Sequence, residues 1–141
     1  MVTHIEEDPM ATTQETLHVG SIVPNFTVDD IKKSIGFYEG LGFVVEERWE
    51  ENGTLQGVML RAGNQRIGLS QDDWKKGRDR KKGVGMRVFI GTTQNVDEIA
   101  ARAKQAGIRL DAEPHDTEWK TRAFEVTDPS GFLLTISTEL Q

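Results

Sequence analysis

Hydrophobic and polar positions alternate in a way that predicts a strand, a helix and three more strands in the first half of the chain. Residues 19–28 alternate as a strand does, with Pro24 placing that strand at an edge or at an interruption of pairing. Residues 31–41 carry an apolar stripe at helical spacing, preceded by Asp29 or Asp30 as the N-cap and followed by Gly42. The remaining strands are predicted over residues 43–49, 54–61 and 65–70.

The same order begins again in the second half. A strand, a helix and three strands are predicted over residues 86–90, 96–106, 108–111, 121–126 and 132–138. The cap and stop residues Asn95 and Gly107 follow Asp30 and Gly42 at an offset of about 65 residues, which indicates an internal repeat. The repeat predicts an α+β fold in which two βαβββ modules, 18–72 and 84–138, form a single domain, 18–141. Residues 73–83 are predicted as the linker, and residues 1–17 as a disordered tail.

Composition and charge argue against several classes of partner and location for this protein. Seventeen basic and 23 acidic residues give a formal charge of −6, which argues against a nucleic-acid partner, because phosphate binding needs a basic face. The chain contains no cysteine, and no apolar run approaches the roughly 20 residues that a membrane helix needs. The first residues contain neither a basic nor an apolar signal-peptide region. We therefore expect a cytoplasmic protein without a membrane partner.

Two segments carry a resemblance to a known family. The helix entry DDIKKSIGFYEGLGF (29–43) and the late turn and strand DPSGFLLTIS (128–137), within paired βαβββ modules, resemble the vicinal oxygen chelate superfamily. That superfamily includes glyoxalase I, extradiol dioxygenases, fosfomycin-resistance enzymes and bleomycin-resistance proteins. The resemblance covers about residues 21–137 and implies the glyoxalase/bleomycin-resistance/dioxygenase fold.

The resemblance also implies where a metal would be bound. Enzymes of the superfamily hold a divalent ion with about four His, Glu or Gln side chains from the first and fourth strands of each module. The corresponding stretches here are 22–25, 67–69, 85–88 and 134–136, in which Asn25 is the one conceivable ligand. His4, His18 and His115 lie outside these stretches and are expected to be surface residues. We therefore predict no metal and no cofactor.

The closest resemblance is to the bleomycin-resistance branch, and it rests on the sequences of residues 62–70 and 122–129. Members of that branch form homodimers whose grooves bind a basic drug without catalysis. The resemblance implies a metal-free homodimer that binds a small organic molecule and sequesters an antibiotic-like ligand. It therefore favours a binding protein over an enzyme. One alternative is a lyase or dioxygenase of the same superfamily with a non-standard site. Another is a scaffold or regulatory dimer whose cavity is filled by its own side chains.

Strand parity predicts the side chains of the binding face, because successive residues of a strand point to opposite faces. If the apolar residues of each strand pack on the helices, a polar set lines the concave face. Arg66 and Arg87 have an alternative role as partners of carboxylates. The predicted ligand-binding residues on strands are Asn25, Arg66, Ser70, Arg87, Phe89, Thr135 and Ser137, together with Arg122 from the stretch that resembles the bleomycin-resistance branch.

The three tryptophans are expected in different environments, according to their positions in the predicted elements. Trp74 lies in the polar linker and Trp119 in a loop, where a core does not need a large ring, so both are predicted in a ligand groove or a dimer interface. Trp49, at a strand end, is expected at the edge of the core. The basic run around residues 75–82 is expected to be a solvated, flexible linker, with binding of an anion as the alternative. Asp72 and Asp73 are expected to form a helix cap or salt bridges with this run.

Overall fold

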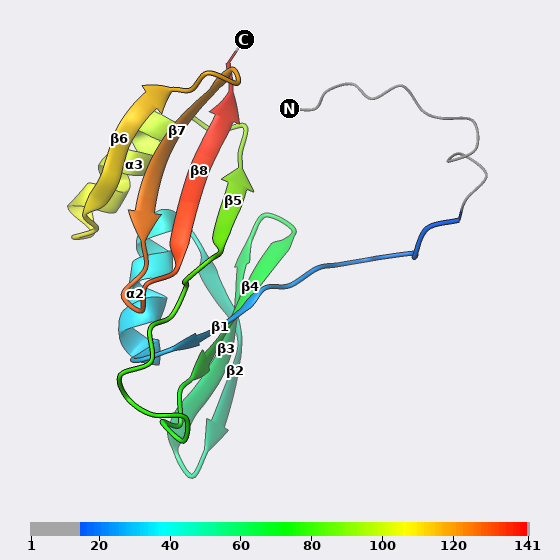
Figure 1. Ribbon diagram of the computed structural model, residues 1–141, viewed down its shortest axis with the longest axis vertical. Coiled ribbons are helices and arrows are strands. Elements are labelled where there is room, and N and C mark those ends of the chain that lie inside the picture. The colour runs from blue at the N-terminus through cyan, green and yellow to red at the C-terminus, as the bar shows by residue number, and fades with distance from the viewer. Residues whose placement is uncertain (1–14, 141) are drawn as a thin grey trace.

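The structure, a computed structural model, describes residues 15–140 and contains two successive modules of one helix and four strands (Figure 1). The first module contains β1 (Asn25–Val28), α2 (Ile31–Leu41), β2 (Val44–Glu51), β3 (Thr54–Ala62) and β4 (Gln65–Gln71). The second contains β5 (Arg87–Gly91), α3 (Val96–Gln105), β6 (Leu110–Asp116), β7 (Thr121–Thr127) and β8 (Leu133–Glu139). The predicted α+β class with two βαβββ modules is confirmed. Most of the predicted tail, residues 1–14, and His4 with it, lies outside the described residues.

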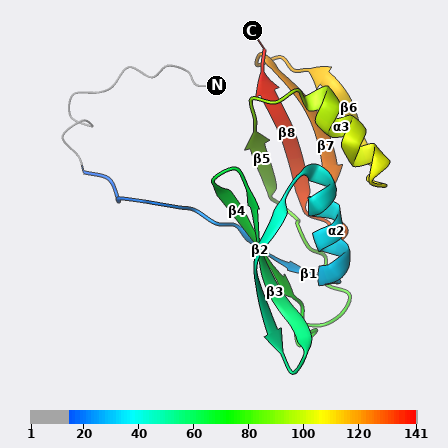
Figure 2. The same cartoon turned by 180° about the vertical axis from the view of Figure 1, so that it is seen from behind.

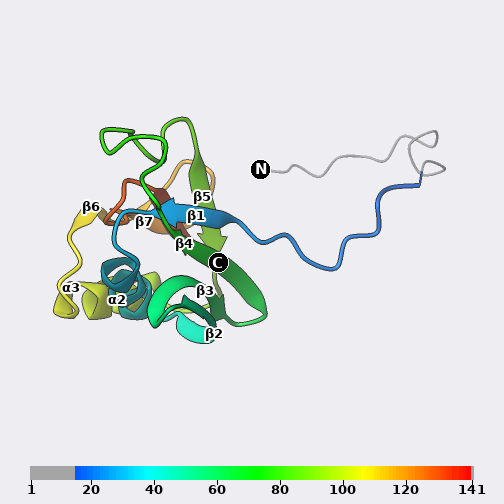
Figure 3. The same cartoon turned by 90° about the horizontal axis from the view of Figure 1, so that it is seen from below.

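Each module forms its own four-stranded sheet. The strand order is β1-β4-β3-β2 in the first sheet and β5-β8-β7-β6 in the second, with β1 parallel to β4 and β5 parallel to β8. Each helix packs on one face of its own sheet and leaves the opposite face uncovered, and the two helices contact each other. Seen from behind, α3 lies in front of β6 and β7, and Figure 3 shows α2 beside α3 (Figures 2 and 3). No helix within the described range is long and apolar enough to cross a membrane.

Side chains at the helix ends explain where the helices begin and stop. Asp30 precedes α2 and accepts a hydrogen bond from the backbone N–H of Lys33, while Asn95 precedes α3 and accepts from two backbone N–H groups. Both caps satisfy donors that have no partner inside the helix. Gly42 follows α2 with a φ of 106°, a left-handed conformation that glycine adopts without a steric penalty.

Two strands differ in length from their predictions. Regular pairing of β1 begins at Asn25, opposite Gly68, so residues 19–24 do not belong to the strand. The carbonyl of Pro24 still accepts a hydrogen bond from Gly68, and the residues before it run away from the sheets in an extended path (Figure 1). β6 continues to Asp116 through a segment that we expected to be a loop, with irregular pairing to β7 around Pro114. An edge strand with a bulge tolerates a proline, because its missing N–H faces away from the sheet.

One apolar core extends through both modules. The ring of Phe26 on β1 stacks on Phe132, just before β8, with 4.3 Å between ring centroids. Tyr38 on α2 is fully buried and donates its hydroxyl to Oδ2 of Asp128 at 3.0 Å. Burial, together with the Asp128 carboxylate, raises the pKa of Tyr38 well above its usual range. The first module is thus joined to the second by side chains that are 90 or more residues apart.

The turn between β7 and β8 is the part of the second module that enters this junction. Oδ1 of Asp128 accepts hydrogen bonds from the backbone N–H groups of Ser130, Gly131 and Phe132 at 2.8–3.0 Å. Gly83 lies against this turn so closely that a Cβ atom there would be 2.2 Å from the carbonyl oxygen of Gly131. The turn therefore fixes the position of the linker as well as that of α2.

The linker between β4 and β5 is held by a buried lysine. The Lys82 side chain is only 5% exposed, and its ammonium donates to Asp29 and, at 2.8 Å, to Oδ2 of Asp72. Asp72 also accepts from the backbone N–H of Trp74 and from Arg80. Burial alone would lower the pKa of Lys82, but these hydrogen bonds raise it overall, and they hold the pKa of Asp72 well below its usual range. Asp72 forms the expected salt bridges, and Lys82 departs from the expected solvated linker, because it lies between two carboxylates while most of its neighbours are exposed.

Candidate functional site

A cavity of about 460 Å³ opens on the face of the second sheet that α3 does not cover. Phe124 and Val126 of β7 and Leu134 and Ile136 of β8 point to the helix and are buried. The alternate residues of the same strands therefore point into the cavity. Five predicted residues meet there: Arg87, Phe89, Trp119, Thr135 and Ser137. Strand parity thus identified which side chains share this face, and their role in ligand binding stays a prediction.

Two exposed aromatic rings form the apolar part of the cavity. Phe89 on β5 is 70% exposed, and Trp119, in the loop between β6 and β7, is 64% exposed. The loop is closed by hydrogen bonds between Thr117 and Thr121, including a 2.7 Å contact between their hydroxyl oxygens. Lys120 adopts a positive φ of 65°, and its carbonyl accepts from the N–H of Leu140. The ring of Trp119 is therefore carried on a fixed loop.

Charged groups are distributed unevenly around the same cavity. Arg87 lies on the edge strand β5, and its NH1 group donates to the Thr135 hydroxyl at 3.0 Å. Glu125 lies on β7, and Glu118 lies in the loop beside Trp119. One cation and several carboxylates thus face the same space, with the cation at the edge next to β8.

His115 also lines the cavity, a position that we did not predict because its segment was expected to be a loop. Its Nδ1 lies 2.8 Å from the carbonyl oxygen of Glu113. A carbonyl only accepts hydrogen bonds, so Nδ1 carries a proton and Nε2 of the neutral ring is an acceptor. His115 pairs with Ala123 of β7, which lines the cavity. This pairing places His115 on the same face of the sheet.

The corresponding face of the first sheet is occupied by its own side chains. Asn25 lies over Gly68, where a Cβ atom would be only 2.4 Å from the amide oxygen, and its Nδ2 donates to the Ser70 hydroxyl at 3.1 Å. Arg66 forms two hydrogen bonds with Glu46, at 2.6 and 3.1 Å, which lower the pKa of that carboxylate. The alternative of a carboxylate partner therefore holds for Arg66. The three predicted residues Asn25, Arg66 and Ser70 lie on this sheet, apart from the cavity of the second.

Two other predicted residues point away from the cavity. Arg122 lies on the helix side of β7, where Asp97 at the start of α3 accepts two of its hydrogen bonds and Asp116 accepts a third. Arg122 does not line this cavity, because it shares strand parity with the buried Phe124, and its role in ligand binding stays a prediction. Trp74 packs within the linker, with the Lys82 ammonium 4.6 Å from its ring centroid and the Arg78 guanidinium at 4.7 Å. Its ring is occupied by these cations and does not line the cavity.

Trp49 was expected at the edge of the core, and the structure places it elsewhere. It is 47% exposed and pairs with Gly57 across β2 and β3, where a Cβ on Gly57 would contact the indole at 3.3 Å. Gly57 in turn pairs with Ser70, so Trp49 shares the uncovered face of the first sheet. Gly57 within a strand is the sequence signal for this close approach.

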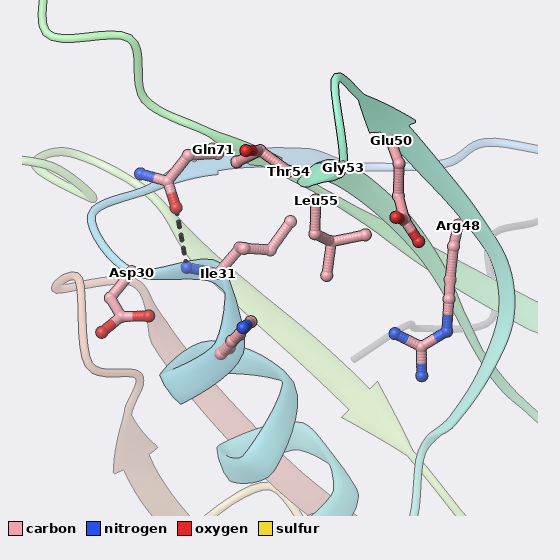
Figure 4. Close-up of a pocket in the computed structure, with 9 residues that line it drawn as sticks. Asp30, Ile31, Arg48, Glu50, Gly53, Thr54, Leu55 and Gln71 are labelled. Carbon is pink, nitrogen blue, oxygen red and sulfur yellow. Dashed lines mark hydrogen bonds between the residues drawn. The ribbon is translucent and has the colours of Figure 1, made fainter.

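A second hollow lies on the helix side of the first sheet. This groove of about 450 Å³ separates the start of α2 from the hairpin of β2 and β3 (Figure 4). Ile31 and Leu55 face each other across it, and Arg48 and Glu50 project from β2 beside them (Figure 4). Gln71 closes one end by accepting a hydrogen bond from the backbone N–H of Ile31 at 3.0 Å. None of the predicted ligand-binding residues lines this groove.

The metal positions that the resemblance implies do not fit a divalent ion. In the four stretches concerned, the residues on the faces that the helices do not cover include Asn25 and Gly68 in the first module and Arg87 and Thr135 in the second. These residues supply no anionic or imidazole ligand, since they offer an amide, a glycine without a side chain, a guanidinium and a hydroxyl. The guanidinium also repels a cation. Within residues 15–140, no group of three or more His, Cys, Asp or Glu side chains is arranged to hold a metal ion.

Comparison with known proteins agrees with this architecture. A bleomycin resistance protein of Geobacillus stearothermophilus is 30% identical over 132 residues, which cover 84% of this chain and 96% of that protein; a bleomycin resistance protein of Staphylococcus aureus matches equally well. Among solved structures, TioX from Micromonospora sp. ML1 superposes with a TM-score of 0.70 at 20% identity over 86% of this chain and 100% of that one. A glyoxalase/bleomycin resistance protein/dioxygenase from Nocardioides gives 0.67 at 15% identity over 94% and 91% of the two chains.

The family model of the Glyoxalase/Bleomycin resistance protein/Dioxygenase superfamily matches residues 17–136, almost the whole of the described structure. The matched residues include almost all of both βαβββ modules and the turn at Asp128. The chain belongs to the Glyoxalase/Bleomycin resistance protein/Dioxygenase superfamily.

Proposed function

We propose that this protein binds a small, antibiotic-like aromatic molecule in the cavity of the second sheet and sequesters it without catalysis. The observation that carries the proposal is the pair of exposed rings, Phe89 and Trp119, beside polar groups in a cavity of about 460 Å³. Small-molecule sites combine apolar walls with a few placed polar groups in this way. The bleomycin resistance proteins among its relatives support the same ligand class.

We further propose that the protein acts as a homodimer. β1 and β5 are both edge strands, and neither pairs with another strand outside its own sheet within residues 15–140. Unpaired strand edges beside exposed apolar side chains favour association. Phe89 lies on such an edge, so a second copy seated there would cover one side of the cavity.

Calorimetric titration with bleomycin and with other cationic aromatic antibiotics tests the binding proposal. We expect saturable binding by the wild type and a weaker affinity in Trp119→Ala, with the same unfolding temperature for the two proteins. Binding that is unchanged in Trp119→Ala would contradict the placement of the ligand, and turnover of a bound compound would contradict sequestration. Sedimentation equilibrium tests the dimer, and a monomer at micromolar concentration would contradict it.

A further inference from the structure

Arg87 has more hydrogen-bond donors than the protein uses. A guanidinium carries five N–H donors in a planar fork. Thr135 accepts one of these bonds at Nη1, and Glu125 forms an ion pair with the same nitrogen at 3.9 Å, a distance too long for a hydrogen bond. No other acceptor for Arg87 occurs in the part of the chain that the structure describes. Most donors of the fork are therefore unused among the described residues, and Arg87 lines the cavity.

Other arginines in the same chain show how this fork is normally satisfied. Arg66 binds both oxygens of Glu46, and Arg122 binds both oxygens of Asp97. Bidentate pairing with a carboxylate matches the geometry of the guanidinium and is stronger than a neutral hydrogen bond. Arg87 lacks such a partner, although its side chain is only 32% exposed and is therefore partly withdrawn from water.

The carboxylates of the cavity differ in their distance from Arg87: Glu125 is its neighbour at 3.9 Å, and Glu118 lies on the other side. Arg87 is on β5, at one edge of the sheet, and Glu118 is in the loop that joins β6 and β7 at the other edge. Adjacent strands are about 4.8 Å apart, so these two groups are separated by roughly 10–15 Å of sheet. Asp116, near Glu118, is already paired with Arg122. The cavity therefore presents the Arg87 guanidinium, with Glu125 beside it, near one edge, and Glu118, for which residues 15–140 supply no ion-pair partner, at the other, and Phe89 and Trp119 also line it.

We propose that the ligand is a zwitterion: an aromatic molecule whose carboxylate is bound by the fork of Arg87 and whose amine lies toward Glu118. This inference rests on the proposed function and specifies the chemistry of its ligand. The Thr135 hydroxyl holds NH1 in position, and the remaining N–H groups bind the two carboxylate oxygens. A ligand without a carboxylate supplies no acceptor for these N–H groups, so it should bind less tightly than a ligand that has one.

Calorimetry with a matched pair of probes tests this inference. Ciprofloxacin carries a carboxylate and a protonated amine on an aromatic core, and its methyl ester retains the amine alone. We expect the wild type to bind the acid about tenfold or more tightly than the ester, as for a charge-assisted hydrogen-bonded pair. Arg87→Gln should bind both probes with the affinity of the ester, and Arg87→Lys, which keeps the charge but loses the fork, should fall between.

Arg102→Gln provides the control, because Arg102 is an exposed residue of α3 on the other side of the second sheet, and it should leave both affinities unchanged. Equal affinities of acid and ester in the wild type would overturn the inference while leaving the proposed function intact. A preference for the acid that persists in Arg87→Gln would overturn the role of Arg87. Failure of both probes, and of the cationic antibiotics above, would overturn the inference and the proposed function together.

Discussion

The two modules have the same order of elements, but their uncovered sheet faces differ. Side chains occupy this face in the first module, whereas the second has an open cavity there. Their helices are about 65 residues apart, and their first strands about 62. In the first module, the amide of Asn25 folds down over Gly68 and is held by Ser70. In the second, the equivalent first strand carries Arg87 and Phe89, and the cavity remains open. A repeated backbone therefore does not imply a repeated site, because a few side chains decide whether a sheet face is filled or open.

The turns before the last strand of each module differ just as clearly. The first module uses the short exposed turn at Gly63 and Asn64. The second uses the longer turn that begins at Asp128, which is buried against Tyr38. The first turn joins two strands only, whereas the second joins two modules, so equivalent substitutions should have very different costs.

Asp128→Ala should produce the largest effect. It removes the acceptor for the Tyr38 hydroxyl and for three backbone N–H groups, and leaves a buried phenol without a partner. We expect the free energy of unfolding to fall by on the order of 3 kcal/mol, measured by urea denaturation. Asn64→Ala in the exposed turn is the matched change and should stay within about 0.5 kcal/mol. Similar losses for the two variants would refute the contrast between the turns.

Lys82→Met should be the next most damaging change. It leaves Asp72 enclosed without its main partner, so we expect the melting temperature at neutral pH to fall by several degrees. Lys81→Met, at the exposed neighbouring position, should leave it unchanged.

The pH dependence should change as well in Lys82→Met. Because the folded pKa of Asp72 is lowered, its contribution is present above the unfolded pKa of about 4 and is lost as the pH falls through the folded value. The wild type should therefore lose stability on acidification more steeply than the variant. Parallel acid-unfolding curves would show that Lys82 does not stabilise the ionised Asp72.

Trp119→Ala and Trp49→Ala compare the two sheet faces directly. Truncating Trp119 should weaken the binding of a cationic aromatic antibiotic by about tenfold, because an exposed ring at a cavity rim contributes mainly to contact with a ligand. Trp49 faces the first sheet, over Gly57, and its loss should change the affinity by about twofold or less. Calorimetry of the two variants side by side gives the answer, and a larger effect for Trp49 would move the site to the first sheet.

Glu46→Gln should have the smallest effect. The pair of Glu46 with Arg66 lies at the surface with both side chains partly exposed, so the unfolding midpoint should not change measurably by urea denaturation. Ligand affinity should also be unaffected, since Arg66 lies apart from the cavity. A marked loss of affinity would mean that Arg66 serves the ligand after all.

Alternation and capping were enough to predict the fold, and strand parity predicted part of the site. Asp30, Asn95 and Gly42 mark helix ends through local chemistry, and Arg87, Phe89 and Thr135 follow from the period of two along a strand. Residues whose position depends on pairing between strands could not be found in this way. The position of His115 in the cavity could be recognised only from the irregular pairing of β6 with β7.

The departures from expectation have the same physical origin. Arg122 was placed by the resemblance of its segment, although parity with Phe124 turns it toward α3. Lys82 was expected in solvent because its neighbours are charged, and only the position of Asp29, 53 residues earlier, shows that it is enclosed. A local composition does not reveal a partner that is distant in sequence.

The contact between Tyr38 and Asp128 has a consequence for how the chain acquires its structure. Phe26 and Tyr38 complete their packing only when the second module has supplied Phe132 and Asp128, about a hundred residues later in synthesis. A nascent chain that ends at the linker therefore exposes these rings, and the two halves should fold together in one cooperative step. The repeat that divides the sequence so clearly does not divide the folding unit.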